Sequence, residues 1–192
     1  MSDHTPWLIV GLGNPGPEYA STRHNVGAMV AAELGIRIGA RFGVHKRGRA
    51  DIAEGRLVEQ RVVVAVPRSY MNESGGSVKA LLDFYKIPLD RLIVVHDELD
   101  IDFATLRVKY GGGDNGHNGL RSVRSAAGSG DFFRVRVGIG RPPGRQDPSA
   151  FVLKPFAAVE RKELPTLVGS AADSIESLIS DGLDDTQSRF NS

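Results

Sequence analysis

The sequence contains no cysteine. A disulfide framework, thiolate catalysis and a zinc or iron–sulfur site with cysteine ligands are therefore excluded, and any metal would need histidine and carboxylate ligands. Long hydrophobic runs are also missing, because the apolar stretch 7–12 is far shorter than the ~20 residues that a membrane helix needs. No basic and hydrophobic leader precedes this stretch. We therefore expect a cytoplasmic protein that contacts no membrane.

The net charge is small as well, with a formal value of +1 at pH 7. This value normally argues against a polyanionic partner, but the charges are unevenly distributed along the chain. Residues 103–154 contain nine Lys or Arg and three acidic residues, whereas residues 155–192 contain three and seven. A nearly neutral chain can thus carry a basic face, although such charges are as often a solvated surface.

Short Val-rich or alternating segments predict strands, and segments with helical periodicity separate them. The strands are expected at 7–10, 50–54, 61–66, 92–95, 105–109 and 134–139, and the helices at 26–34, 76–85, 120–127, 158–164 and 166–179. Because strands and helices interleave, we expect one α/β domain over residues 1–192, with a twisted sheet flanked by helices. Neighbouring strand pairs within 50–66 and 105–139 favour a mixed sheet.

Three glycines within 11–16 follow the first predicted strand and match the dinucleotide motif G-x-G-x-x-G. That motif binds a pyrophosphate where a helix begins at the glycines. Here Pro17 follows the last glycine, and the next helical pattern begins only at Val26, with Asn25 as a candidate N-cap. A dinucleotide site is therefore disfavoured. The glycines instead favour a tight loop that presents Asn14 at the carboxyl end of the strand.

An imidazole and several carboxylates occur at other element ends. His24 lies just before a predicted helix, and the segment "VVHDELD" ends a predicted strand with His96, Asp97 and Glu98. Carboxylates in this position could bind a hard cation. Alternatively, one of them could hold the imidazole of His24 in the fixed tautomer that a histidine base needs.

Two asparagines lie in further loops. Asn72 in "PRSYMNESGG" has the alternative interpretation of a turn or capping residue. Asn118 lies in "GGGDNGHNGLRSV", which lacks the Gly-Lys-Ser/Thr ending of a P-loop, and it could simply cap a helix that begins at Leu120. Each of these patterns is weak when taken singly.

Together, these residue types favour hydrolysis of an ester or amide. An imidazole can activate water, a carboxylate can orient the imidazole, and neutral amides can hold a carbonyl group and its oxyanion. Because the chain has no thiol and no serine in a recognisable nucleophile motif, direct attack by water is simpler than a covalent intermediate. The residues by themselves name no substrate.

The longer motifs resemble those of the bacterial-type peptidyl-tRNA hydrolase family. The segments "GLGNPGPEYASTRHNVG", "PRSYMNESG", "HDELD", "GGGDNGHNGL" and "FRVRVGIGRPPGRQDPSAFVL" occur in the family's order and spacing between Leu8 and about Leu153. The resemblance implies a monomeric α/β enzyme without metal, cofactor or obligate protein partner. Its activity would be cleavage of the ester between a peptide and the 3′ ribose of tRNA, which recycles the tRNA of prematurely released peptidyl-tRNA.

The resemblance also implies residue roles by position. His24 is expected to be the catalytic base, Asp97 its supporting carboxylate, and Asn14 a residue that distinguishes a peptidyl end from a free aminoacyl end. The residues expected to bind the tRNA or the peptidyl end are Tyr19, Tyr70, Met71, Asn72, His117 and Asn118, with Lys109 and Arg136 at the tRNA phosphates. The family often has Phe at position 70, so the hydroxyl of Tyr70 inherits no role.

Several points stay open at the level of the sequence. Basic contacts to phosphates attract any tRNA regardless of its sequence, which gives the basic segment a use. The segment "RPPGRQDPSAFVL" could be a lid over the peptide groove or only a surface loop. The acidic segment 173–185 receives no function. Two rival activities are a metal-dependent hydrolase built on His96, Asp97 and Glu98, and a non-catalytic RNA-binding module.

Overall fold

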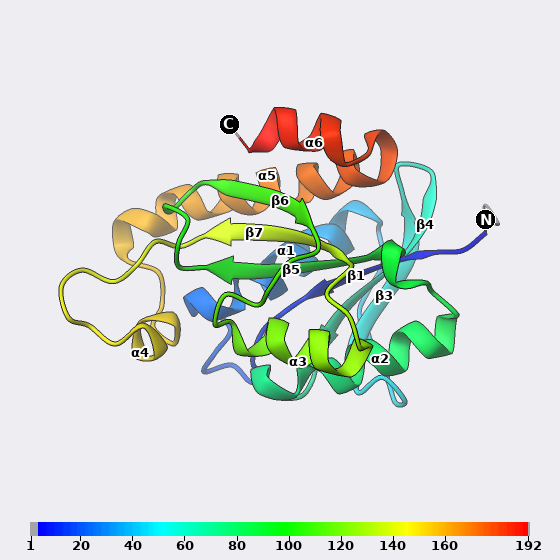
Figure 1. The fold of residues 1–192 in the computed structure, drawn as a ribbon, viewed down its shortest axis with the longest axis horizontal. Coiled ribbons are helices and arrows are strands. Elements are labelled where there is room, and N and C mark those ends of the chain that lie inside the picture. The colour runs from blue at the N-terminus through cyan, green and yellow to red at the C-terminus, as the bar shows by residue number, and fades with distance from the viewer. Residues whose placement is uncertain (1–3, 192) are drawn as a thin grey trace.

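The computed structural model describes residues 4–191, in which seven strands form one mixed sheet (Figure 1). The strands are β1 (Trp7–Gly11), β2 (Gly43–His45), β3 (Ala50–Leu57), β4 (Gln60–Pro67), β5 (Leu92–Glu98), β6 (Leu106–Tyr110) and β7 (Phe133–Gly138). Their order across the sheet is β2-β3-β4-β1-β5-β7-β6. The central pairs β4–β1, β1–β5 and β5–β7 are parallel, and the outer pairs are antiparallel. The expected mixed α/β sheet is confirmed.

Helices cover both faces of this sheet (Figure 1). They are η1 (Arg23–Asn25), α1 (Val26–Arg37), η2 (Met71–Glu73), α2 (Ser74–Tyr85), η3 (Leu89–Arg91), α3 (Asn118–Ala127), α4 (Pro148–Val152), α5 (Ala158–Asp181) and α6 (Leu183–Phe190). One core cluster joins the sheet to α1 and α5, and a second joins it to α2 and α3. Within 4–191, none of the helices combines the length and the apolar character needed to cross a bilayer.

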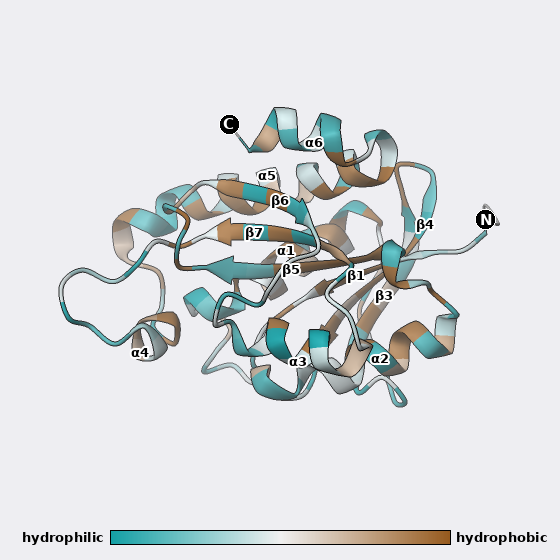
Figure 2. Cartoon of the chain, viewed as in Figure 1, coloured by the Kyte–Doolittle hydropathy of each residue, from teal (hydrophilic) through white to brown (hydrophobic). Residues whose placement is uncertain are grey.

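The central strands are buried on both faces, which explains their continuous hydrophobic runs. On β1, Ile9 packs in the cluster of α1 and α5, whereas Leu8 and Val10 pack in the cluster of α2 and α3. Figure 2 shows the resulting hydrophobic centre of the sheet. The carboxyl end of β5 is the hydrophilic exception, because residues 96–98 continue the strand with polar side chains that are nevertheless buried.

Gly11, the first glycine of the G-x-G-x-x-G motif, and Gly27 in α1 allow close packing of a helix on the sheet. A Cβ on Gly11 would lie 2.2 Å from the carbonyl oxygen of Gly27 in α1, and a Cβ on Gly27 would lie 2.3 Å from the carbonyl oxygen of Val95 in β5. Two glycines thus let α1 pack directly on the backbone of β1 and β5. No helix begins at the motif, since α1 starts at Val26. The interpretation of this stretch as a loop that presents Asn14 agrees with the structure.

Several element boundaries differ from the expectation. Strand β5 continues to Glu98 rather than ending at Val95. The two helices expected on either side of Pro165 are the single helix α5. Proline removes one helical hydrogen bond, but Leu167 and Ala171 of the following turns pack in the core and favour continuation of the helix. The short elements β2, α4 and α6 were not expected.

The chain beyond the acidic segment 173–185 covers one edge of the sheet. After α6, the side-chain amide of Asn191 pairs with the backbone of Val108 on edge strand β6, accepting from its N–H at 2.7 Å and donating to its carbonyl at 3.0 Å. Gln187 donates to the same carbonyl at 3.0 Å. Pairing of this kind blocks association of another strand at the sheet edge.

His96 is a buried polar residue on β5, only 1% exposed. Its Nδ1 donates to the backbone carbonyl of Asp97 at 2.9 Å, and its Nε2 has no hydrogen-bond partner. Burial, with the nearby imidazole of His117, outweighs the attraction of the Asp97 carboxylate and lowers the pKa of His96 from 6.5 to about 3. The imidazole is therefore neutral across the neutral pH range.

This lowered pKa predicts a pH-dependent stability. Between about pH 6.5 and pH 3 the unfolded chain protonates His96 and the native chain does not, so the free energy of unfolding falls as the pH decreases, by at most about 1.4 kcal/mol per pH unit. His96→Gln should remove this share of the slope in urea titrations from pH 7 to pH 4.5. Identical slopes for His96→Gln and the parent would contradict the assignment.

Candidate active site

A cleft of about 560 Å³ opens at the carboxyl ends of the parallel strands. Parallel strands end at the same edge of a sheet, so the loops that follow them meet there. The predicted residues that line the cleft are Asn14, His24, Tyr70, Met71, Asn72, Asp97, His117 and Asn118. Three predicted residues lie outside its lining: Tyr19, Lys109 and Arg136.

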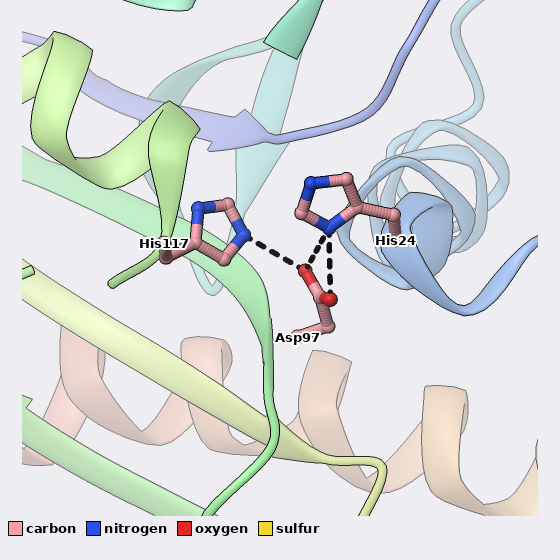
Figure 3. Close-up of side chains that lie close together, drawn as sticks. All are labelled: His24, Asp97 and His117. Atoms are coloured by element: carbon pink, nitrogen blue, oxygen red, sulfur yellow. Dashed lines mark hydrogen bonds and ion pairs between the residues drawn. The ribbon is translucent and has the colours of Figure 1, made fainter. Parts of the chain in front are cut away.

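His24 and Asp97, which both line the cleft, point toward each other (Figure 3). The Nδ1 of His24, in η1, lies 3.0 Å from Oδ1 and 2.9 Å from Oδ2 of Asp97, on β5. An ionised carboxylate only accepts, so this geometry places the imidazole proton on Nδ1. The Nε2 of His24 is then left as the basic nitrogen.

His117 approaches the same carboxylate from the other side (Figure 3). Its Nε2 lies 2.8 Å from Oδ1 of Asp97, and its Nδ1 accepts from the backbone N–H of Leu120 at 3.1 Å. A neutral imidazole has one donor and one acceptor, so these partners place the proton of His117 on Nε2. His117 is also the N-cap of α3. The sequence favours Asn118 for this role, but Asn118 is the first residue of the helix.

Asp97 is only 3% exposed, yet its carboxyl group is ionised. Burial by itself raises its pKa most strongly, but the electrostatic attraction and the hydrogen bonds of His24 and His117 together outweigh burial and hold the pKa far below its ordinary value. The two imidazoles thus replace the water that a carboxylate loses on burial. Asp97 is thereby prepared to stabilise a positive charge on His24.

Asn14 is held rigidly beside this pair. Its backbone N–H donates to Oδ1 of Asn25 at 2.9 Å, and Nδ2 of Asn25 donates back to its carbonyl at 3.0 Å. The side-chain oxygen of Asn14 accepts from the backbone N–H of Met71 at 2.7 Å. The remaining polar group is the Nδ2 amide, a hydrogen-bond donor on a residue that lines the cleft. Asn25 therefore braces Asn14, and makes no side-chain cap for α1.

Asn72, Asn118 and the two tyrosines lie around the cleft mouth. Asn72 and Asn118 are exposed, and no side-chain hydrogen bond within residues 4–191 occupies their amides. Tyr19 packs edge-on against Tyr70, with ring centroids 6.4 Å apart. Tyr19 thus borders the cleft through Tyr70, which is 55% exposed.

Lys109 and Arg136 lie on one face of the outer strands, beside the cleft. Residues 107 and 109 of β6 pair with residues 136 and 134 of β7, so four basic side chains share this face. Arg136 binds Glu98, which lines the cleft, through two contacts of 3.1 and 2.9 Å. Burial, with Arg136 and Arg134 nearby, lowers the pKa of Lys109.

A second set of polar residues, whose contacts the sequence does not predict, joins the loops around the cleft. The Nδ2 of Asn115 donates to both Glu98 and Asp100, at 2.8 Å each. Arg141 donates to Asp100 at 2.6 Å. The loop beyond Arg141 ends in α4, whose residues 148, 149 and 152 line the cleft. Part of the segment "RPPGRQDPSAFVL" therefore forms a wall of the cleft. The sequence left open whether this segment is a lid over the groove or only a surface loop.

The hydrogen bonds of the site also bear on metal binding. Among residues 4–191, the group that could hold a cation is His24, Asp97 and His117, whose ligand atoms lie within 4.8 Å of one another. Ligation through Nε2 of His117 would move its proton to Nδ1, which faces the N–H of Leu120. The donor set thus fits a hydrogen-bonded triad better than a metal site. The ligand atoms of the alternative set, residues 96, 97 and 98, do not form such a group within residues 4–191. Glu98 is also already bound to Arg136.

Comparisons with known proteins identify the family of this chain. The model of the peptidyl-tRNA hydrolase family matches residues 8–192. The peptidyl-tRNA hydrolase of Frankia alni is 60% identical over 190 residues, with 99% of this chain and 96% of that protein covered. The enzyme of Mycolicibacterium smegmatis is 59% identical over 182 residues, with 95% of each covered. The crystal structure of the Acinetobacter baumannii enzyme matches with a TM-score of 0.92 at 32% identity, covering 100% of this chain and 97% of that one. This chain belongs to the peptidyl-tRNA hydrolase family.

Proposed function

We propose that this chain hydrolyses the ester bond between the peptide and the 3′ ribose of tRNA in peptidyl-tRNA. The single observation that carries the proposal is the His24–Asp97 pair, in which a buried carboxylate holds the imidazole with Nε2 as its basic nitrogen inside a cleft. Family membership supplies the substrate class, and the pair supplies the chemistry.

In the proposed reaction, Nε2 of His24 removes a proton from water as the water oxygen attacks the ester carbonyl carbon. The Nδ2 amide of Asn14 donates a hydrogen bond to the carbonyl oxygen and stabilises the negative charge that develops there. Collapse of the tetrahedral intermediate breaks the bond to the ribose oxygen, which takes the proton from the His24 imidazolium. The products are tRNA with a free 3′ hydroxyl and a peptide with a free carboxyl group.

Asp97 and His117 support the reaction through their contacts with His24 and with each other. The Asp97 carboxylate stabilises the imidazolium that His24 becomes during the reaction. Both ring nitrogens of His117 are engaged within the protein, by Asp97 and by Leu120. We therefore revise the expected role of His117 from substrate binding to orientation of Asp97.

The remaining polar residues of the cleft are proposed to bind the substrate. Asn72 and Asn118 offer free amides that can donate to and accept from the peptide backbone or the terminal nucleotide. Tyr70 supplies apolar surface beside them, and Tyr19 supports the ring of Tyr70. Met71 is only 4% exposed and packs in the core, so we propose that it acts through its backbone N–H, which holds Asn14. Lys109 and Arg136 are proposed to attract the tRNA phosphates, with Glu98 orienting Arg136.

The first test measures release of peptide from peptidyl-tRNA by the purified chain. His24→Ala removes the base and should lower turnover by roughly 10²–10⁴-fold. Asp97→Asn should lower it by at least about 10²-fold and change the pH profile, because an amide can donate to Nδ1 and favour the wrong tautomer of His24. Both variants should bind tRNA nearly as the parent does.

The control for these variants is Asp83→Asn, which removes an exposed carboxylate that pairs with Lys79 on α2. It should retain parental turnover. Near-parental turnover in His24→Ala would contradict the proposed base. A parent that binds tRNA without releasing peptide would favour an RNA-binding module, and a parent that loses activity on exhaustive chelation would favour a metal-dependent hydrolase.

A further prediction separates tRNA binding from chemistry. Lys109→Ala and Arg136→Ala should each weaken tRNA binding and reduce the slope of log K against log salt by roughly 0.7–0.9, the share of one phosphate contact. Hydrolysis of a minimal substrate that lacks most of the tRNA should change much less. Arg56→Ala, on β3 at the far side of the sheet, is the matched control. Equal losses on both substrates would contradict a role at the phosphates.

A further inference from the structure

Arg23 immediately precedes His24 in η1, and the proposed reaction does not use it. It is only 7% exposed, which is unusual for a charged side chain. Its guanidinium carbon lies 3.9 Å from the centre of the Phe151 ring, in a stacked cation–π contact. A buried charge of this kind needs its partners in place, because an arginine that lost them would remain desolvated.

The partners of Arg23 come from two segments more than a hundred positions further along the chain. One terminal nitrogen, Nη1, donates to the backbone carbonyl of Phe151 in α4 at 3.3 Å. The other, Nη2, donates to Oε1 of Glu160 in α5 at 3.1 Å. The same Oε1 accepts from the backbone N–H of Ala157 at 2.9 Å, so Glu160 is itself fixed at the first turn of α5.

The backbone around Arg23 is joined to the same region. Its N–H donates to the carbonyl of Lys154 at 3.1 Å, and Thr22 forms an isolated antiparallel bridge with Pro155. The segment that carries His24 is therefore bound to the chain just after α4 through the backbone, and to α4 itself through the side chain of Arg23.

Helix α4 depends on such external contacts. It has five residues, too few for a helix to be stable by itself. Its residues Pro148, Ser149 and Val152 line the cleft, and Phe151 is the one that points into the core. The guanidinium of Arg23, which lies over the ring of Phe151, thus holds α4 against the segment that carries His24.

We propose that Arg23 is a positioning residue that holds α4, a wall of the substrate cleft, at a fixed distance from His24. This inference rests on the proposed function, because it assigns the wall to binding of the peptidyl end. The planar fork of the guanidinium reaches two acceptors on different segments while the same group lies over the ring of Phe151. A lysine ammonium is a compact point charge without this planar fork. Arg23 acts through the position of α4 and does not touch the reacting atoms.

The test uses Arg23→Met, which keeps most of the side-chain volume and removes both donors. Loss of a charge-assisted contact should reduce the population with α4 docked, and KM for peptidyl-tRNA should rise by about tenfold while kcat changes much less. The pH profile of kcat should stay parental, because the His24–Asp97 pair is unchanged. Hydrogen exchange of the amides in 149–156 should become faster.

Arg37→Met is the matched control, because it also removes a partly buried arginine that forms ion pairs with α5. Arg37 on α1 contacts Asp173 at 2.8 Å together with Glu176, at a distance along α5 from the cleft. This variant should lower the thermal midpoint but keep the parental KM and the parental exchange in 149–156. The comparison separates a general loss of stability from a loss of α4 position.

Glu160→Gln keeps the test decisive if Arg23→Met does not fold. Its carboxamide oxygen can still accept from Ala157, and only the charge opposite Arg23 is lost, so a smaller rise in KM and in exchange is expected. Parental KM and parental exchange in the variants that fold would overturn the proposal, as would a fall in kcat at unchanged KM. If the parent releases no peptide, the proposed function fails, and the exchange comparison still tests the contact of Arg23 with α4.

Discussion

The site depends on a negative charge buried at the end of a strand. A carboxylate deprived of water stays ionised only where donors replace its hydration, and Asp97 has two imidazole donors, from His24 and His117. The carboxylate in turn determines which nitrogen of each ring carries the proton. His24 faces the cleft with a basic nitrogen because Asp97 holds its other one, and Asp97 holds its position because His117 is anchored at the start of α3.

The architecture of the sheet makes this contact attainable. Glycines at 11 and 27 allow α1 to lie directly against β1 and β5, which brings the segment before α1 close to the end of β5. His24 therefore reaches Asp97 from a neighbouring element rather than from a long flexible loop. Buried contacts of Arg23 with Phe151 and Glu160 hold the same segment from its other side. The proposed base is thus positioned by rigid elements on both sides, and an imidazole held in this way loses little orientational freedom when substrate binds.

The outline of fold and site could be predicted from the sequence, because it follows from local patterns. Doubly buried strands are continuous apolar runs. Asn14 follows one predicted strand and Asp97 ends another, so both lie at the same sheet edge, and His24 directly precedes a predicted helix. What could not be predicted depends on tertiary contacts. The cap of α3 is His117 rather than Asn118, a difference of one residue that decides a tautomer. The partners of Arg23 lie 128 and 137 positions away, and α5 continues through Pro165 because its core contacts outweigh one lost hydrogen bond.

The central claim is that Asp97 holds two neutral imidazoles in the tautomers that leave His24 basic toward the cleft. The most direct test is ¹⁵N NMR of the imidazole nitrogens in histidine-labelled protein at alkaline pH, with His24→Ala and His117→Ala used for assignment. The account predicts a protonated Nδ1 and an unprotonated Nε2 for His24, and the opposite arrangement for His117. A proton on Nε2 of His24 in the neutral ring would contradict it.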